Sequence, residues 1–256
     1  MFKLNTVGRK SQPKRTRKEW RGAIIGMVLG DSSLIQPKHR DGIRRGNYLL
    51  DMSHSRRQKE YLEFKRDILN EIFEYHIPVR DITVTIKKIG KSYPASRVFT
   101  RVHSRFKMIA KNIYINGKKR ITPWALDNIT DEGLAIWWMD DGCMHYDPRP
   151  DHGGGFCVWG TYGFQKEEVQ LFQDWLKNTY GISLRLSLNK KSGGWYLRRG
   201  MSEAVKLNDI CRQYAHPSML YKFSDTSKAF KRGPYNLSNS VRPLSNPKGD
   251  EIVQSV

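Results

Sequence analysis

Cysteine is scarce in this sequence, and the few that occur do not form the pattern of a disulfide-stabilised protein. The 256 residues include three cysteines, Cys143, Cys157 and Cys211. Small secreted domains held together by disulfides carry a dense, even-numbered set. We therefore expect an intracellular, reducing compartment. The composition leaves open whether this is a bacterial or archaeal cytoplasm or an organelle such as a mitochondrion or chloroplast.

Long hydrophobic runs are also missing. No apolar stretch approaches the roughly 20 residues that a membrane-spanning helix needs. The N-terminus is polar and basic, without the apolar segment of a signal peptide. We therefore expect no membrane partner.

Acidic residues are few relative to basic ones. Asp and Glu total 25 against 45 Lys and Arg, which gives a formal net charge of +20. An excess of this size favours a polyanionic partner, and nucleic acid is the first candidate. A solvated basic surface without a specific partner is the alternative that charge alone leaves open.

Two polar tails flank a repetitive centre. Residues 1–19 form a basic segment with Pro13, which predicts an unpacked arm, and residues 233–256 are rich in Pro, Ser and Asn, which predicts an extended tail. Between them, residues 20–120 and 121–232 repeat one order of elements: helix, strands, helix, strands, helix. Hydrophobic periodicity predicts strands over 47–54, 81–88, 96–104, 155–163, 182–189 and 195–201, and helices over 58–75, 105–113, 165–180 and 202–214.

A short apolar segment ending in aspartate occurs once in each half. The copies are Ile24–Ser32 and Leu134–Gly142, and in register Asp31 matches Asp141. Each copy predicts a buried helix with a carboxylate at its C-terminal end, where the helix dipole disfavours an anion. A bound divalent cation would remove this conflict, and two such ends together could hold metal over a phosphate. The alternative for either aspartate alone is a cap or a surface charge.

The first copy also carries a stripe of glycines. Gly22, Gly26 and Gly30 are four residues apart and share one helix face. Since each glycine weakens a helix by roughly 1 kcal/mol relative to alanine, the stripe predicts that another helix backbone approaches closely. The second copy has Ile136 where the first has Gly26, and it carries tryptophans that we assign to the core. The predicted helix crossing is therefore asymmetric.

Both segments resemble the LAGLIDADG motif of homing endonucleases. The second copy resembles the single-chain, intron-encoded branch of that family, and so does the segment Pro217–Phe223. The resemblance covers roughly residues 21–223. It implies an α+β fold, in which a pseudo-twofold pair of αββαββα halves places two antiparallel sheets as a saddle over DNA. The implied activity is that of a monomeric endodeoxyribonuclease, which hydrolyses both strands of a long asymmetric target and leaves 3′ overhangs.

The resemblance also implies roles for individual residues. Asp31 and Asp141 would be the catalytic metal ligands, and Mg²⁺ the cofactor, with Mn²⁺ or Ca²⁺ able to substitute in binding. Gly30 and Asp140 precede them in the motif and belong to the implied metal site, although the Asp140 side chain itself is interpreted as a bystander. Two basic residues would complete the catalytic set, Lys222 in the second half and, in the first, one of Lys118, Lys119 and Arg120, of which we choose Lys119.

The implied saddle would lay its strands in the major groove, where every base pair is distinguishable. Basic residues in or beside the predicted strands are therefore candidates for DNA contacts. They are Arg44, Arg45, Lys87, Arg97, Arg101, Arg185, Arg198 and Arg199. Any one of them contacts phosphate more often than a base, so the prediction concerns the set.

Other functions remain open from the sequence. A maturase that binds its own intron RNA on the same scaffold is one alternative, and a DNA-binding regulator without catalysis is another; the intact aspartate pair favours the nuclease. No protein-splicing segment is visible beside the motifs, so we expect an intron-encoded or free-standing gene. Cys143, His145, His152 and Cys157 fit no common zinc-finger spacing, and the glycines at 153–155 lack a phosphate-loop signature.

Overall fold

The computed structural model describes residues 15–38, 40–43, 46–73, 75–87, 89–146 and 155–223. Most of the predicted arm, the predicted C-terminal tail, the candidate DNA contacts Arg44 and Arg45, and His152 lie outside these ranges.

Each half has the predicted αββαββα order. The first half consists of α1 (Arg17–Leu29), β1 (Ser32–Ile35), β2 (Leu49–Ser55), α2 (Lys59–Phe73), β3 (Val79–Ile86), β4 (Lys91–Phe99) and α3 (Arg105–Ile113). The second consists of α5 (Asp131–Asp141), β7 (Gly142–Tyr146), β8 (Gly155–Trp159), α6 (Lys166–Tyr180), β9 (Arg185–Leu188), β10 (Trp195–Gly200) and α7 (Met201–Cys211). The predicted α+β fold with two related halves is confirmed.

Short elements join and follow the halves. The connection consists of the hairpin β5 (Tyr114–Ile115) and β6 (Lys118–Lys119) and the helix α4 (Pro123–Asn128). After α7 the chain makes two 3-10 turns, η3 (Arg212–Tyr214) and η4 (Pro217–Lys222), and a third, η1 (Arg56–Gln58), precedes α2.

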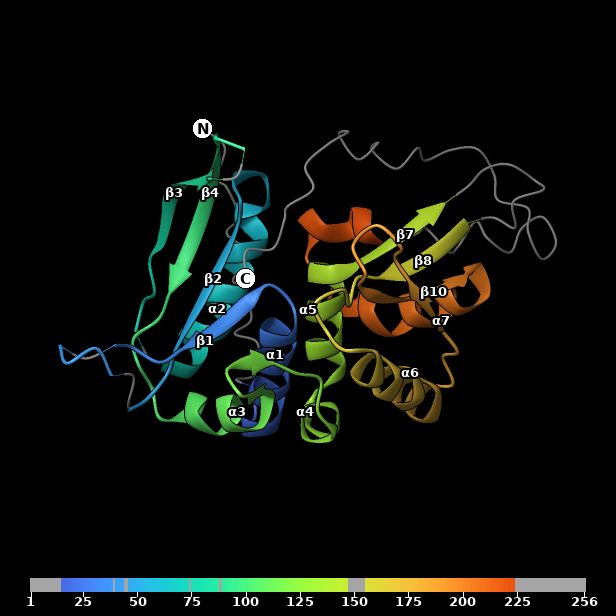
Figure 1. Cartoon of the computed structure of the whole chain (residues 1–256), viewed down its shortest axis with the longest axis horizontal. Coiled ribbons are helices and arrows are strands. Elements are labelled where there is room, and N and C mark those ends of the chain that lie inside the picture. The colour runs from blue at the N-terminus through green and yellow to red at the C-terminus, as the bar shows by residue number, and fades with distance from the viewer. Residues whose placement is uncertain are drawn as a thin grey trace, which may run out of the picture.

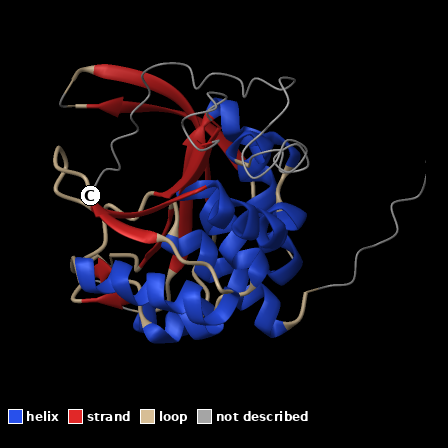
Figure 2. Ribbon diagram, turned by 90° about the vertical axis from the view of Figure 1, so that its right-hand side faces the viewer, coloured by secondary structure: helices blue, strands red, loops and turns tan. Residues whose placement is uncertain are grey.

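The two sheets have equivalent topologies. Their strand orders are β1-β2-β4-β3 and β7-β8-β10-β9, and all neighbouring strands are antiparallel. Figure 1 shows the sheets on either side of α1 and α5, which lie side by side in the middle of the molecule. In Figure 2 the strands gather toward one side and most helices toward the other. Each sheet therefore has one face covered by helices and one face open.

The glycine stripe lies where α1 crosses α5. A Cβ on Gly26 would overlap the carbonyl oxygen of Gly133, and one on Gly22 would overlap the Thr130 side chain. The close helix approach predicted from the stripe is confirmed. The second helix contributes a glycine of its own, Gly133, which the motif register did not indicate because it falls before the repeated segment.

Bulky side chains of α5 point the other way, into the second half. Trp137 and Trp138 are fully buried, and Trp137 stacks on Phe172 with ring centroids 4.4 Å apart. The assignment of these tryptophans to the core is confirmed. Among the described residues, no helix combines the length and apolar composition that crossing a membrane would require.

Three features differ from the sequence-based expectations. Helix α1 begins at Arg17, inside the predicted arm, because Thr16 and Glu19 form a capping box. The positions of the short strands β1 and β7 were not located from periodicity, since four or five residues give too little of it to detect. Strand β4 runs through Pro94, which pairs with Thr83 on edge strand β3 before β2 joins β4 at Ala95. Proline is tolerated there because one side of the strand is open.

Candidate active site

The two motif aspartates lie together at the C-terminal ends of the crossed helices. Asp31 follows Gly30, the cap of α1, and Asp141 is the last residue of α5. The two carboxylates are close enough for the charge of Asp31 to raise the pKa of Asp141. The Asp31 side chain is 29% exposed, so the pair is open to solvent on one side.

One lysine from each half approaches the carbonyl group that precedes each aspartate. Lys119 Nζ donates to the Gly30 carbonyl at 2.6 Å, and Lys222 Nζ donates to the Asp140 carbonyl at 3.2 Å. Because Gly30 and Asp140 are equivalent positions of the repeat, these two contacts follow the pseudo-twofold symmetry. The residues predicted as catalytic and metal-binding are thus brought together, although this placement leaves their roles as predictions.

A hairpin selects Lys119 among the three candidate basic residues. Asn116 and Gly117 both have positive φ, 53° and 74°, and form the two-residue loop between β5 and β6. The resulting alternation turns Lys119 toward the aspartates and leaves Lys118 exposed. Arg120 instead pairs with Glu168 at 3.3 Å. The Asn-Gly dipeptide at positions 116–117 could have indicated this hairpin from the sequence.

Burial and like charge perturb the titration of the site. Burial, followed by the charge of Asp140, raises the pKa of Asp31 to about 6. Burial, followed by the charge of Asp31, raises the pKa of Asp141 well above its usual range. Burial lowers the pKa of Lys119, while the surrounding aspartates oppose this shift. Without a cation, keeping these carboxylates ionised therefore costs the folded protein free energy.

This cost predicts a pH-dependent stability of the metal-free protein. The folded-state pKa of Asp31 is about 6 against an ordinary 3.8, so the folded state binds a proton more tightly than the unfolded state. Stability should fall as the pH rises through this interval. In thermal melts with a chelator at about pH 8, Asp31→Asn should raise the Tm and flatten its pH dependence. Asp127→Asn, an exposed change on α4, should do neither, and a lower Tm for Asp31→Asn would contradict the charge conflict.

The donor set fits a divalent cation. Asp31 and Asp141 offer carboxylate oxygens, and Gly30 and Asp140 offer the adjacent carbonyl oxygens. Hard cations such as Mg²⁺ take oxygen ligands of these kinds. Burial is the first cause of the raised pKa values of both aspartates, and the charge of a neighbouring aspartate is the second. A cation bound between the carboxylates would favour their charged forms.

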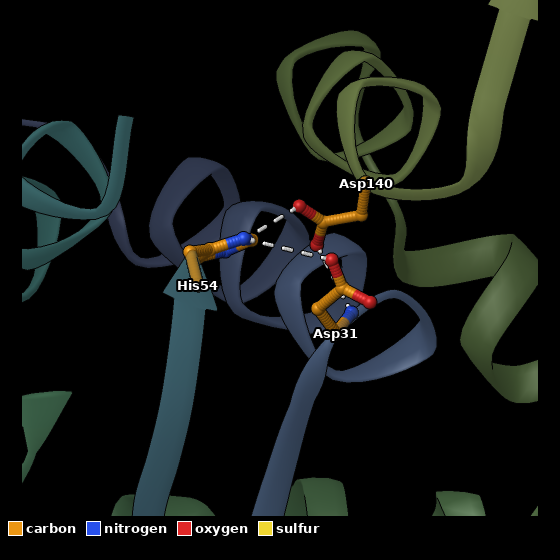
Figure 3. Close-up of side chains that lie close together, drawn as sticks. All are labelled: Asp31, His54 and Asp140. Carbon is orange, nitrogen blue, oxygen red and sulfur yellow. Dashed lines mark hydrogen bonds and ion pairs between the residues drawn. The ribbon is translucent and has the colours of Figure 1, made fainter. Parts of the chain in front are cut away.

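Three buried residues beside the aspartates form contacts that the sequence did not indicate. Asp140 was interpreted as a bystander, yet its side chain is fully buried and accepts from Lys65, also fully buried, at 2.7 and 2.9 Å. His54 on β2 faces the carboxylates of Asp31 and Asp140 from one side, with Nδ1 3.7 Å from Asp31 and Nε2 3.9 Å from Asp140 (Figure 3). Burial and the Lys65 charge lower the pKa of His54 to about 3, so its ring is neutral. Lys65 was detectable, because it interrupts the buried stripe of α2 between Tyr61 and Ile68.

The open sheet faces carry a cross-strand pair of arginines in equivalent strand pairs. Arg185 on β9 is the direct cross-strand partner of Arg198 on β10, and Arg80 on β3 is the partner of Arg97 on β4. All four are exposed. Like charges directly opposite one another destabilise a sheet. Arg97 is paired with Asp51 on β2 through both carboxylate oxygens at 2.6 Å, so the Arg185–Arg198 pair is the one that indicates an anionic partner for its open face. Arg80 was missed because the predicted strand began at residue 81.

The other candidate DNA contacts lie elsewhere. Arg199 is paired with the buried Cys157, so alternation places it on the face opposite to Arg198. Lys87 and Arg101 lie just beyond the ends of β3 and β4, and both are exposed. Arg101 stacks on the ring of Tyr75 at 4.9 Å.

The sequence matches a known family over most of its length. The family model described as the LAGLIDADG DNA endonuclease family matches residues 21–207. The chain belongs to this family. The resemblance of both motifs is therefore confirmed, and the matched range contains both motif aspartates and Lys119, while Lys222 lies after it.

Individual relatives and a solved structure agree with the assignment. A probable intron-encoded endonuclease 1 of Wickerhamomyces canadensis is 28% identical over 200 residues, which cover 78% of this chain and 81% of the relative. The cytochrome b mRNA maturase bI2 of Saccharomyces cerevisiae is 26% identical over 209 residues, 79% of this chain and 46% of the relative. The structure of the homing endonuclease I-WcaI bound to its DNA recognition sequence has a TM-score of 0.67 at 24% identity and covers 85% of this chain and 96% of that one. This last likeness shows the fold.

Some relatives are much longer than the matched region. Protein RecA of Mycolicibacterium flavescens is 26% identical over 218 residues, which cover 83% of this chain and 48% of the relative. The chain thus spans about half the length of the RecA relatives it matches.

Proposed function

We propose that the protein is a homing endonuclease that cuts both strands of a long, asymmetric DNA target by metal-dependent hydrolysis, leaving 3′ overhangs. The observation that carries this proposal is the convergence of Asp31 and Asp141 with Lys119 and Lys222 where α1 crosses α5. The site contains two sets of groups, each with one carboxylate, one carbonyl and one lysine. Two sets suit two phosphodiester bonds, one in each strand.

The proposed roles follow from the chemistry of these groups. Asp31, Asp141 and the carbonyl oxygens of Gly30 and Asp140 would hold divalent cations, with Mg²⁺ as the proposed ion. When bound, such a cation polarises a phosphate and lowers the pKa of a water molecule. Lys119 and Lys222 place positive charge beside each aspartate, where negative charge develops on the phosphate during attack.

The open sheet faces support a DNA target of this size. The Arg80–Arg97 and Arg185–Arg198 pairs lie in different halves, on either side of the crossed helices. Two surfaces flanking one cleavage site would contact two half-sites of a duplex. Because the halves differ in sequence, a single copy suits an asymmetric target, and we propose that the protein acts as a monomer.

Cleavage of a candidate target tests the proposal. If an intron encodes the protein, joining the exons that flank this intron gives that target; a randomised plasmid library supplies one otherwise. We expect Mg²⁺ to support conversion of the supercoiled target plasmid to the linear form, and a chelator to prevent it. A target-free plasmid is the control, and the absence of linear product from every target plasmid would contradict the proposal.

The two lysines give a more specific prediction. Lys119→Ala and Lys222→Ala should each slow cutting by about 10²- to 10³-fold, as the loss of one group that stabilises transition-state charge does elsewhere, with little change in DNA binding. Lys118→Ala is the matched control, because Lys118 neighbours Lys119 on β6 but is exposed. The measurement is the single-turnover cleavage rate at saturating enzyme. A loss of binding instead would make these lysines phosphate-positioning contacts.

A maturase role is the second candidate, and the similarity to the Saccharomyces maturase favours it. In this case the partner would be intron RNA. We would then expect tight, salt-dependent binding to the flanking intron transcript and stimulation of its splicing. If Asp31→Asn no longer cuts DNA but still stimulates splicing, cleavage and splicing depend on different residues of the same fold.

A further inference from the structure

The pseudo-twofold symmetry of the site is broken at one position. Gly30 and Asp140 are equivalent in the repeat, and their carbonyl oxygens both accept from a lysine. Their side chains differ, because Gly30 has none and Asp140 has a carboxylate. A Cβ on Gly30 would overlap the Asp140 carboxylate. Where these two positions meet, there is therefore room for only one side chain.

The Asp140 carboxylate reaches across the helix crossing to the other motif. Its Oδ2 accepts from the main-chain N–H of Asp31 at 3.1 Å. The same carboxylate is paired with the Lys65 ammonium through both oxygens, at 2.7 and 2.9 Å, and neither side chain is exposed. Lys65 also lies 4.7 Å from the ring centroid of Tyr61, whose hydroxyl donates to the Ile136 carbonyl of α5. The pair is therefore held by α2, α5 and the end of α1 together.

This arrangement does not suit a further metal ion. Asp31, His54 and Asp140 offer ligand atoms within 4.8 Å of one another. However, the Lys65 ammonium already neutralises Asp140, and a second cation beside it would be repelled. Neutral His54 on β2 packs edge-on against Tyr61, with 5.3 Å between the ring centroids, and faces the carboxylates of Asp31 and Asp140. The cluster of Asp140, Lys65 and His54 is therefore better suited to holding Asp31 in place than to binding a metal ion.

Asp141 has a different support. Its Oδ2 accepts from Trp137 Nε1 at 3.0 Å, one helical turn earlier on α5. The second aspartate is therefore oriented within its own helix, whereas the first depends on an ion pair supplied by α2 and α5.

We propose that the buried Asp140 side chain positions Asp31 by accepting from its main-chain N–H, and that it thereby controls cleavage of one DNA strand more than the other. Asp140 is the positioning residue, and Lys65 neutralises its buried charge; neither side chain faces the open side of the site. The inference rests on the proposed function, because it assigns each aspartate mainly to one strand.

Two double variants isolate the hydrogen bond from the charges. Lys65→Met with Asp140→Asn removes both buried charges but keeps an oxygen that accepts from the Asp31 N–H. Lys65→Met with Asp140→Leu removes both charges and the acceptor while keeping the branched, four-atom shape of the side chain at position 140. The measurement is the single-turnover rate constant for each strand of a duplex target labelled on both strands. The ratio of the two rate constants does not depend on the folded fraction.

We expect the Asn variant to keep the wild-type ratio of strand rates. The Leu variant should slow one strand by about ten- to a hundredfold relative to the other, as misplacement of a catalytic group does, so that nicked plasmid accumulates. An unchanged ratio in the Leu variant, or an equal change in both variants, overturns the inference. A wild-type protein that cuts neither strand would instead overturn the proposed function.

A measurement on the wild-type protein keeps the inference testable if the variants do not fold. Amide hydrogen exchange should show strong protection of the Asp31 N–H, because its acceptor is a buried, charged carboxylate. Exchange of this amide at the rate of an exposed turn would overturn the positioning role.

Discussion

Asp31→Asn and Asp141→Asn should each abolish double-strand cutting while specific DNA binding persists. Each change keeps the shape of the side chain but removes the negative charge that a divalent cation needs at the end of its motif helix. We expect the cleavage rate to fall by about 10³-fold or more, the scale of losing an electrostatic group of an active site. Gel-shift binding and single-turnover cleavage on one target duplex measure the two effects separately.

The control for these variants is Asp127→Asn, which makes the same chemical change at an exposed position of α4. It should bind and cut as the wild-type protein does. A second readout is available without cleavage. Mg²⁺ should raise the Tm of the wild-type protein by mass action, and this increase should shrink in either active-site variant. Linearisation of the target plasmid by both single variants would show that the aspartates are not the catalytic ligands.

Gly26→Ala should have the largest effect on stability. A methyl group at this position would overlap the Gly133 carbonyl group, which belongs to the backbone of α5 and cannot rotate away. Although alanine favours a helix by about 1 kcal/mol over glycine, separating the two helices should cost about 3 kcal/mol or more. Urea unfolding should therefore show a much lower midpoint for this variant.

Gly163→Ala is the matched control, because Gly163 is exposed and a Cβ there would meet no atom within 4 Å. Its free energy of unfolding should stay within about 0.5 kcal/mol of the wild-type value. If Gly26→Ala is as stable as this control, the close helix crossing is not what the glycine stripe serves. If Gly26→Ala is stable and binds DNA but no longer cuts it, the close crossing is needed for the active-site geometry and not for the stability of the fold.

Periodic features of this protein were readable from its sequence because they repeat. The helices over 105–113 and 165–180 were placed within a residue of their observed ends, since their apolar residues recur every three or four positions. Strands β1 and β7 escaped detection because they are short and continue directly from the motif helices. The register of the repeat also selected Asp141 rather than Asp140 as the equivalent of Asp31, and the structure places both equivalent residues at helix ends.

The sequence by itself determined the duplicated architecture, the two helix-end aspartates and the close approach at Gly26, because each follows from local spacing along the chain. Only the tertiary structure decided that Asp140 supports Asp31, that Lys65 neutralises Asp140, and that Arg80 lies opposite Arg97. Asp140 lies 109 residues from Asp31 and 75 from Lys65 along the chain. Contacts over such separations depend on how helices cross and sheets register, and no local pattern encodes them. Lys65, Lys222 and Lys119 oppose the rise in the pKa of Asp31 that burial and Asp140 cause, and a divalent cation would stabilise the charged carboxylates further.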